Sequence, residues 1–349
     1  MKNIRTGVIN WDASLPPETY FGYYQTRTLS PAKYRYATPF YADIVNENKI
    51  TYHYRTPEEY EKELTFAIEA GIDYFAYVFY PDKGSRDHIS LEYKDCSHRV
   101  YELNFARKLH EQSRLSGKIG MCSIVNPGHP YDDCDIDELV LLMGMDYYEK
   151  IAGRPLVYLF HSAPARFIDR INTACQKNGV PKPYYVSMLP FPKDGEAYDC
   201  IDGLSSYACF KGGIENYSQL CDEMICGNSI RQKKCLEQGL SVVPHFTAGW
   251  DPSPRVDIPS PWVSYENTSY HSPATSDELY GGGVKLCRWI KENCADNFSG
   301  HIMTFAWNEF EEGGWICPTY NADLSVNTDR IKVMKKLAEL WKTELGSMK

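Results

Sequence analysis

The stretch Thr304-Phe-Ala-Trp-Asn-Glu-Phe-Glu-Glu-Gly-Gly-Trp315 begins with apolar residues and then breaks into three glutamates. An apolar run of this length is typical of a buried strand, and the change to charged residues marks the strand's end. The glutamates are Glu309, Glu311 and Glu312, framed by tryptophans and followed by a pair of glycines. An acidic surface turn is the alternative interpretation, but the aromatic and glycine framing favours a functional strand end.

Seven similar apolar runs precede this one and alternate with helical patterns. The expected strands are Gly7–Asn10, Ile72–Tyr80, Ile119–Val125, Leu156–Phe160, Tyr184–Met188, Ile201–Tyr207, Ser241–Phe246 and Ile302–Ala306. Their near-continuous apolar character suits parallel strands that are buried on both faces. Eight strands that alternate with helices predict an α/β fold, a (β/α)8 TIM barrel that forms a single catalytic domain over residues 1–349. Two doubly wound domains are the rival, but the usual nucleotide-binding glycine motifs do not occur.

The helices between these strands have recognisable ends. Thr56-Pro57-Glu58-Glu59 is a capping box with proline at the first helical position, and the pattern stops at Gly71. Further helices are expected at 97–115, 136–149, 164–178, 215–238, 276–294 and 328–346. The link from Leu189 to Asp199 contains prolines and a glycine, and it is expected to be a bare loop.

In such a barrel the chemistry lies in the loops after the carboxyl ends of the strands. Polar and aromatic residues follow nearly every expected strand here. The candidate substrate-binding residues among them are Trp11, Asp12, Tyr80, Asn126, Tyr207, Trp250, Asp251, Arg255, Trp307, Asn308 and Trp315. Structural roles are the alternatives: Trp250 and Trp307 could be core residues at the barrel mouth, Asn126 could belong to an Asn-Pro-Gly turn, and Asp251 with Arg255 could be a loop ion pair.

Carboxyl groups beside aromatic rings are what cleavage of a glycosidic bond requires. One carboxyl donates a proton to the leaving oxygen, and another acts as base or nucleophile. Aromatic rings offer flat apolar faces to sugar C–H groups. If the residues after the last strand form a tight turn, Glu309 and Glu312 point the same way into a cleft, and Glu311 points elsewhere. Glu309 and Glu312 are therefore the expected catalytic pair.

Two segments resemble a known family. Trp307-Asn-Glu-Phe-Glu-Glu-Gly313, followed by Ile316 and Pro318, resembles the Asn-Glu-Trp-x-Glu-Gly signature of the glycoside hydrolase family 99-like group. Val243-Pro-His-Phe-Thr-Ala-Gly-Trp-Asp-Pro-Ser-Pro-Arg255 is similar to the same group's Gly-Trp-Asp motif with a following arginine. Weaker similarities at Ala70–Phe75 and Gly153–Val157 extend the resemblance over most of the chain. The group includes endo-α-mannosidases and the WbsX-type proteins of bacterial polysaccharide gene clusters.

The resemblance implies a (β/α)8 barrel and a retaining hydrolase. It implies that Glu309 acts as a base on the substrate's own 2-hydroxyl, through a 1,2-anhydro-sugar, and that Glu312 serves as acid and then as base. The chain departs from the family pattern at Phe310, where tryptophan is usual, and at Cys317, where glutamate is usual. Tyr20–Arg27 stands in place of the family's opening Trp-Gly-x-Gly-Phe-x-Glu-Trp run. These departures leave the sugar and its linkage open.

Two other functions stay open at this point. A polysaccharide-biosynthesis enzyme of the WbsX type, similar to a glycosyltransferase, would need a nucleotide-sugar donor, and no diphosphate-binding motif is recognisable. A non-catalytic glycan-binding protein would keep the aromatic residues without needing both carboxyl groups. All three functions imply a carbohydrate partner. The oligomeric state is not fixed by the sequence.

The amino-acid composition bears on the partners, cofactors and location of the protein. The chain of 349 residues carries 37 Lys and Arg against 46 Asp and Glu, a net charge of −9, which argues against a nucleic-acid partner. The 12 cysteines include no Cys-x-x-Cys pair, and the lone histidines His161 and His245 lack partners at metal-binding spacing, so we expect no metal and no cofactor. No run approaches the ~18 apolar residues of a membrane span. With no apolar signal-peptide core after Met1, a cytoplasmic location is expected, or a periplasmic or secreted one if a leader was removed.

Overall fold

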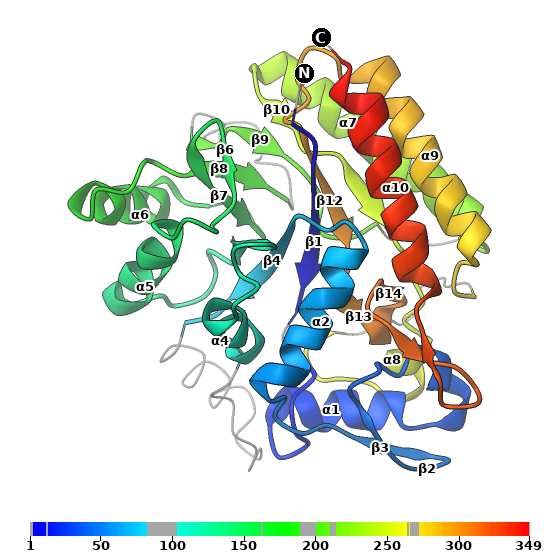
Figure 1. The fold of residues 1–349 in the computed structure, drawn as a ribbon. Coiled ribbons are helices and arrows are strands. Elements are labelled where there is room, and N and C mark those ends of the chain that lie inside the picture. Colours follow the sequence, from blue (N-terminus) through cyan, green and yellow to red (C-terminus); the bar gives the residue numbers. More distant parts are fainter. Residues whose placement is uncertain are drawn as a thin grey trace.

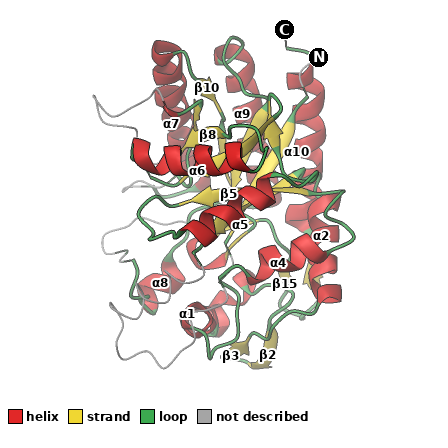
Figure 2. Cartoon of the chain, turned by 90° about the vertical axis from the view of Figure 1, so that its left-hand side faces the viewer, coloured by secondary structure: helices red, strands yellow, loops and turns green. Residues whose placement is uncertain are grey.

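The computed structural model describes residues 3–11, 13–81, 103–161, 163–188, 200–209, 214–263, 265 and 272–348. Parallel strands form its centre and helices surround them (Figures 1 and 2). The strands follow the order β10-β9-β8-β7-β5-β4-β1-β12-β11 in the sheet. They are β1 (Arg5–Asn10), β4 (Tyr74–Phe79), β5 (Gly120–Val125), β7 (Arg154–Leu159), β8 (Tyr184–Ser187), β9 (Gly203–Leu204), β10 (Ser241–Val242), β11 (His245–Thr247) and β12 (His301–Phe305).

The sheet closes on itself through one interrupted strand. β10 and β11 stand at opposite ends of the strand order, yet only Val243 and Pro244 separate them in the chain. The Val243 N–H donates to the carbonyl of Leu204, and the Met303 N–H donates to the carbonyl of Pro244, both at 2.9 Å. With β10 and β11 counted as one strand, the predicted strands are present and the predicted barrel is confirmed. The interruption has a simple cause, since Pro244 has no N–H for the ladder.

Both faces of the strands are buried. Inside the barrel, the hydroxyls of Tyr74 and Tyr158 meet at 3.0 Å, and the Tyr74 ring fills the space left by Gly7, where a Cβ would lie 2.1 Å from the ring. On the outer face, Phe246 packs against Trp341 of a covering helix, with ring centroids 5.4 Å apart. This double burial explains why the strands read as nearly continuous apolar runs.

Helices cover the outer face of the barrel (Figure 2). They are α2 (Pro57–Glu69), α4 (Phe105–Gln112), α5 (Asp133–Met143), α6 (Ala165–Lys177), α7 (Tyr217–Gln238), α9 (Ser276–Asn293) and α10 (Asp329–Gly346). The capping box of α2 is confirmed, with the Glu59 N–H donating to the Thr56 hydroxyl at 3.2 Å. α5 corrects the predicted range 136–149, because Asp132 caps a start at Asp133 and the helix ends before Gly144. The predicted loop at 189–199 lies outside the described residues, as do residues 97–102 of the helix predicted at 97–115, whose described part contains α4.

A layer of short elements covers the carboxyl ends of the strands, and the sequence analysis missed it. α1 and α8 lie there with the β2–β3 hairpin, at the lower end of Figure 1. α1 escaped prediction because it buries the polar Gln25 and Thr28 together with its aromatic residues, so its pattern is not clearly amphipathic. The short elements of this layer are α1 (Tyr20–Leu29), a 3-10 helix at Ala32–Ala37, β2 (Asp43–Asn46), β3 (Lys49–Thr51), α8 (Ser253–Asp257), β13 (Asn308–Glu309), η3 (Phe310–Glu312), β14 (Gly314–Trp315), β15 (Thr319–Tyr320) and β16 (Val326–Asn327). A further short strand, β6 (Lys150–Ile151), pairs with the first residues of β7 at the other end of the barrel.

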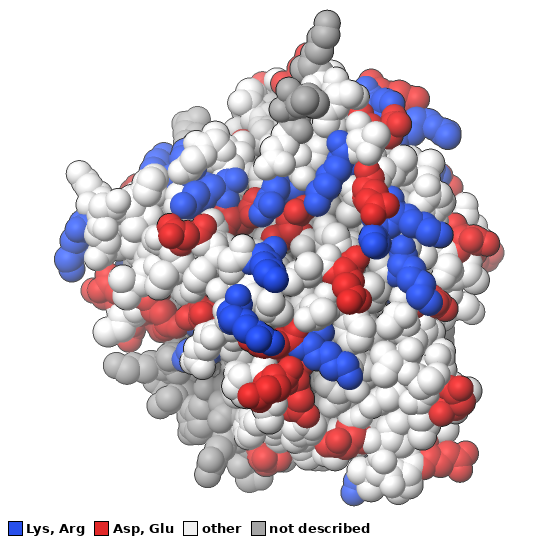
Figure 3. Space-filling model, viewed as in Figure 1, with Lys and Arg blue, Asp and Glu red and all other residues white. Residues whose placement is uncertain are grey.

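Figure 3 shows how the charged side chains are distributed on one face of the molecule. On the face in Figure 3, acidic and basic side chains are intermixed rather than gathered into a field of one sign. No helix within the described ranges has the length and apolar character that crossing a bilayer demands.

A partly buried ion network ties the strands together at the opposite end of the barrel. The guanidinium of Arg5 donates to both oxygens of Glu149, at 2.9 and 2.5 Å, and Nε2 of His301 lies 2.9 Å from Glu149 Oε1. Asp73 lies 3.4 Å from the same arginine. Burial works against ionisation of Glu149, but the bonds from His301 and Arg5 outweigh it and hold the pKa of Glu149 below its ordinary value.

Replacing Glu149 by glutamine should lower the free energy of unfolding by about 2–3 kcal/mol, because Arg5 and His301 lose their shared carboxylate. The depressed folded-state pKa means that this contribution is complete above the unfolded pKa of about 4.3 and is lost as the pH falls through the folded value. Urea unfolding at about pH 7 and about pH 3 measures it, and the gap between variant and wild type should shrink at the lower pH. An equal gap at both pH values would contradict this. Glu61→Gln, which breaks a pair with the exposed Arg114, is the control and should cost less than about 1 kcal/mol.

Candidate active site

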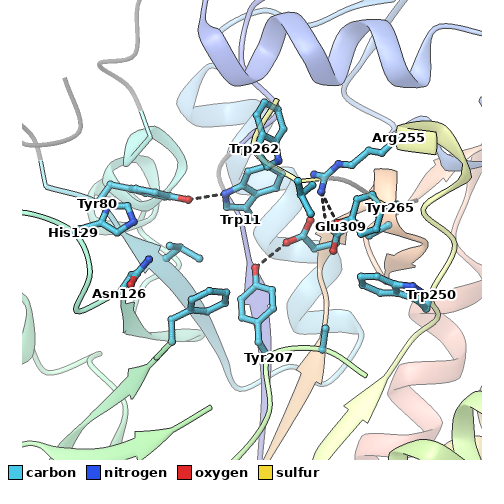
Figure 4. Close-up of a pocket in the computed structure, with 15 residues that line it drawn as sticks. Trp11, Tyr80, Asn126, His129, Tyr207, Trp250, Arg255, Trp262, Tyr265 and Glu309 are labelled. Carbon is cyan, nitrogen blue, oxygen red and sulfur yellow. Dashed lines mark hydrogen bonds and ion pairs between the residues drawn. The ribbon is translucent and has the colours of Figure 1, made fainter. Parts of the chain in front are cut away.

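A cavity of about 420 Å³ lies at the carboxyl ends of the strands (Figure 4). Loops that are far apart in the sequence meet in its wall. Most of the predicted site residues line it, namely Trp11, Tyr80, Asn126, Tyr207, Trp250, Arg255, Glu309 and Glu312. The rest of the wall is mainly apolar. This position at the carboxyl ends is the one where barrels of this kind carry chemistry.

The turn after β12 directs two of the three glutamates into the cavity. Glu309 ends β13 and Glu312 ends the 3-10 turn η3. A 3-10 turn has three residues per turn, so side chains three apart share a face. Glu309 and Glu312 accordingly line the cavity, whereas Glu311 lies behind its wall. This is the arrangement that the spacing of the glutamates predicts.

Two glycines let this turn pack tightly against the loop after β11. Gly313 has φ 76°, and a Cβ there would lie 2.2 Å from the backbone nitrogen of Asp251. A Cβ on Gly249, at φ 151°, would lie 2.4 Å from the carbonyl oxygen of Gly313. The close approach allows the Asp251 N–H to donate to the carbonyl of Glu312 at 2.7 Å. The glycines thus fix the glutamate turn instead of loosening it.

Glu309 is buried and accepts its side-chain hydrogen bond from a neutral donor. The hydroxyl of Tyr207 donates to Glu309 Oε1 at 2.8 Å, a contact visible in Figure 4. Burial, followed by the negative charge of Glu312, raises the pKa of Glu309 to about 8. Burial and the nearby carboxylates also raise the pKa of Tyr207 well above its ordinary value, so its phenol stays a neutral donor. These surroundings therefore favour the protonated form of Glu309 over the ionised form.

Glu312 and Glu311 share one arginine. Arg255, from α8, donates through Nη1 to Glu312 and through Nη2 to Glu311 Oε2 at 3.1 Å. The hydroxyl of Tyr265 also donates to Glu312, and that of Thr28 donates to Glu311. Burial opposes the charge on Arg255, but the two carboxylates keep its pKa well above the ordinary range. Arg255 thus bonds directly to Glu312 and Glu311.

An aromatic wall that the sequence analysis missed faces this charged group. Trp262 lines the cavity and packs against Phe21 and Tyr24 of α1, with centroids 4.9 and 5.4 Å apart. Arg255 lies 5.6 Å from the Trp262 ring centroid. Trp262 and Tyr265 come from a loop beyond α8, well past the end of β11, where the analysis of strand ends did not reach. The sequence signal that could have identified them is the presence of two aromatic residues close together in that loop.

Asn308 holds the exit of β1 beside the exit of β12. Its side-chain oxygen accepts from the Trp11 N–H at 2.8 Å, and its amide nitrogen donates to the Trp11 carbonyl at 2.7 Å. The Trp11 indole N–H donates in turn to the hydroxyl of Tyr80 at 2.8 Å (Figure 4). Asn308 does not line the cavity, so the role the structure gives it is to position the Trp11 ring.

Three other residues that were predicted to bind substrate do not line the cavity. Trp307 is fully buried and its indole N–H donates to Glu63 of α2 at 2.8 Å, so it is a core residue and not a stacking platform. Trp315 lies outside the cavity with the Arg330 guanidinium 4.1 Å above its ring. Asp251 accepts from the Ser253 N–H at 3.1 Å and caps the turn into α8. Asp12 lies outside the described residues.

The remaining polar groups indicate no metal site in the part of the chain that is described. Within these ranges, no cluster of three or more His, Cys, Asp or Glu side chains is placed to hold an ion. His129 lines the cavity opposite the glutamates. His245 is buried in β11, and burial together with the charge of Arg231 lowers its pKa to about 3, so its ring is neutral. His161 is exposed just after β7.

Comparison with known proteins finds solved structures of similar fold but no similar sequence. No family model matches the sequence, and no curated protein sequence matches it either. Among solved structures, the chain is similar to the GH99 endo-α-mannosidase of Bacteroides thetaiotaomicron in complex with bis-tris propane, with a TM-score of 0.56 and 11% identity over 99% of this chain and 100% of that one. A second structure of a GH99 endo-α-mannosidase from the same organism matches with a TM-score of 0.52 and 13% identity over 88% of this chain and 86% of the other.

These likenesses extend over nearly the whole chain and confirm, at the level of the fold, the resemblance found in the sequence motifs. What this likeness shows is a shared fold, an α/β barrel. The chain therefore has the fold of the glycoside hydrolase family 99 enzymes.

Proposed function

We propose that the protein is a retaining glycoside hydrolase that acts on an oligo- or polysaccharide, with Glu309 and Glu312 as its catalytic pair. The observation that carries the proposal is that two buried carboxyl groups face one cavity in opposite environments. Glu312 is bonded to a guanidinium, whereas Glu309 is bonded to a neutral phenol. Two carboxyl groups whose surroundings separate their pKa values can act as acid and base at the same pH.

The chemistry follows from this asymmetry. A protonated carboxyl gives its proton to the glycosidic oxygen as the bond to the anomeric carbon breaks. A carboxylate on the other side of the scissile bond assists the group that attacks that carbon. The resemblance to the family 99-like group supports attack by the sugar's own 2-hydroxyl, which retains the anomeric configuration after water opens the intermediate.

The aromatic residues that line the cavity suit a saccharide. The rings of Trp11, Trp250 and Trp262 line the cavity and offer apolar faces to the C–H groups of a pyranose. The amide of Asn126 and the ring of His129, opposite the glutamates in Figure 4, offer polar contacts for hydroxyls. Because the structures of similar fold are endo-α-mannosidases, α-linked mannosides are the first substrates to test.

Glu309→Gln and Glu312→Gln should each lower kcat by about 10²–10⁴-fold on a glycan that the wild type cleaves, because each removes an acid or base from the transition state. A panel of α- and β-linked oligosaccharides identifies that glycan, and proton NMR of the first product shows whether its anomeric configuration is retained. Glu61→Gln on the outer helix α2 is the matched control, and it should leave kcat within about twofold.

The outcomes separate the other functions. Near-normal turnover in either glutamine variant would remove that residue from the catalytic pair, and an inverted product would refute the retaining route. Thermal stabilisation by a nucleotide sugar, without cleavage of any glycan in the panel, would favour a biosynthetic enzyme. Binding of a glycan that is never cleaved, with equal affinity in the glutamine variants, would favour a non-catalytic binding protein.

Trp262→Ala should raise KM by about 3- to 10-fold and leave kcat nearly unchanged. A ring stacked on a sugar contributes roughly 0.5–1.5 kcal/mol, and a ring away from the breaking bond holds substrate and transition state alike. Steady-state kinetics on the same glycan measures this. Tyr280→Ala, which removes an exposed ring on α9, is the control and should change neither constant. A large fall in kcat with unchanged KM would contradict a purely binding role for Trp262.

A further inference from the structure

A second cavity, of about 380 Å³, lies beside β14 and the first turn of α10. None of the described residues in its wall also lines the cavity that holds Glu309 and Glu312. Its wall includes two aromatic rings, three polar side chains and one guanidinium, which belong to Tyr36, Trp315, Ser276, Thr319, Asn327 and Arg330. We call it the Arg330 cavity.

Arg330 carries a positive charge that pairs with no carboxylate in the described ranges. Its guanidinium donates through Nη1 to the carbonyls of Ala248 and Trp315, at 3.2 and 2.6 Å, and through Nη2 to the carbonyl of Ala274 at 3.4 Å. Burial lowers the pKa of Arg330 to about 10, so the side chain is still charged at neutral pH. The carbonyls anchor the guanidinium without neutralising it, and a charge that is withdrawn from water without a counter-ion is unfavourable.

The position of Arg330 in α10 is also unfavourable for the helix itself. Arg330 is the second residue of α10, where the N–H groups of the first turn leave a partial positive charge that favours anions and repels cations. The side chain is nevertheless held firmly, with its guanidinium 4.1 Å from the centroid of the Trp315 ring. A cation that is fixed in an unfavourable place beside a cavity indicates an anionic ligand in that cavity.

The donors that remain free in the Arg330 cavity suit a carboxylate with hydroxyl groups beside it. Nε of Arg330 bonds to none of the described residues and Nη2 makes one long bond, so their shared edge is open to the two parallel bonds that a carboxylate accepts. The hydroxyls of Ser276 and Thr319 line the same wall and bond to nothing in the described part of the chain. The amide nitrogen of Asn327 is equally free, because only its side-chain oxygen is used, accepting from the Asp329 N–H at 2.9 Å.

The charges around the Arg330 cavity fit a ligand with one negative charge. Its wall has no lysine and no second arginine among the described residues. Asp329 also lines the wall, and its carboxylate pairs with Lys332 at 2.9 Å. One guanidinium balances one carboxylate, whereas a phosphate dianion would leave an excess negative charge beside Asp329.

We propose that the Arg330 cavity binds the carboxylate group of a sugar acid, with the guanidinium of Arg330 on the carboxylate and the side chains of Thr319 and Asn327 on the sugar hydroxyls. This site goes beyond the proposed hydrolase function and does not depend on it, because neither Glu309 nor Glu312 lines the Arg330 cavity.

The test is NMR of the full chain labelled with ¹⁵N and ¹³C, in which the Nε–H signal of Arg330 is assigned through its own side-chain carbons and followed as ligand is added. D-Glucuronate should shift this signal with a dissociation constant of about 1–10 mM, because one ion pair and a few hydrogen bonds hold the ligand. Acetate should bind at least about threefold more weakly, since it lacks the hydroxyls. D-Glucose, which lacks the carboxylate, should leave the signal in place. Sodium chloride keeps the ionic strength constant.

Asn327→Asp is the variant that tests the location of the ligand. It keeps the oxygen that accepts from the Asp329 N–H, so the start of α10 is preserved, and it replaces the free amide donor by a negative charge. It should weaken D-glucuronate binding by at least about tenfold, because two like charges then lie close together. Asn321→Asp is the matched control, since it adds the same charge at a residue outside the cavity wall, and it should change the constant by less than about twofold.

Three results would overturn the proposal. The first is an Arg330 signal that does not move at about 100 mM D-glucuronate, well above the expected constant. The second is equal affinity in Asn327→Asp and the wild type, which would put the ligand elsewhere. The third is inorganic phosphate or acetate that binds as tightly as D-glucuronate, which would make this a site for a free anion and not for a sugar acid. The titration needs no turnover, so its result is independent of whether any glycan is cleaved.

Discussion

The pairing of Arg255 with two carboxylates at the exit of the last strand is the interaction on which the site depends. A single guanidinium can satisfy two carboxyl groups because its donors form a planar fork. Bringing it there requires α8 to approach the glutamate turn closely, which Gly249 and Gly313 permit. The guanidinium of Arg255 also packs beside aromatic rings, 5.3 Å from the ring centroid of Trp11 and 5.6 Å from that of Trp262.

A second buried ion pair joins this turn to the outer layer of helices. Glu63, on α2, accepts from the indole N–H of Trp307 and from the guanidinium of Arg55, and both members of the ion pair are almost completely buried. The strand that leads into the glutamate turn is thereby fixed from the helix side as well as from within the barrel. Such buried polar contacts are costly unless fully bonded, so they favour one arrangement of the strand exit over others.

The barrel could be predicted from the sequence because its strands are buried on both faces and therefore read as apolar runs. The interruption at Pro244 was visible as a residue, but whether it ends a strand or only breaks a ladder depends on its neighbours in space. α1 was missed because it buries polar side chains. One of them, Thr28, is buried where its hydroxyl donates to Glu311, which lies near the other end of the chain. No local pattern records a partner so distant.

The glutamate pair was accessible to sequence reasoning because a spacing of three is a local property. The tryptophans were not, since Trp307 and Trp262 look alike in the sequence and differ only in what surrounds them. Trp307 belongs to the barrel and meets Glu63, whereas Trp262 belongs to a loop and meets the cavity. Exposure of an aromatic ring is decided by tertiary packing, and a single sequence does not contain it.

Part of the cavity lining comes from a loop and part from the barrel, so the two parts can be altered independently. Trp262 and Tyr265 are supplied by a connecting loop, while the charged turn is supplied by the barrel. Loops tolerate insertion and replacement far better than strands do. A laboratory selection that randomised the loop beyond α8 would therefore change the aromatic lining of the cavity while leaving Glu309 and Glu312 in place on the barrel. The shape of the cavity and the arrangement of the glutamates could then be engineered separately.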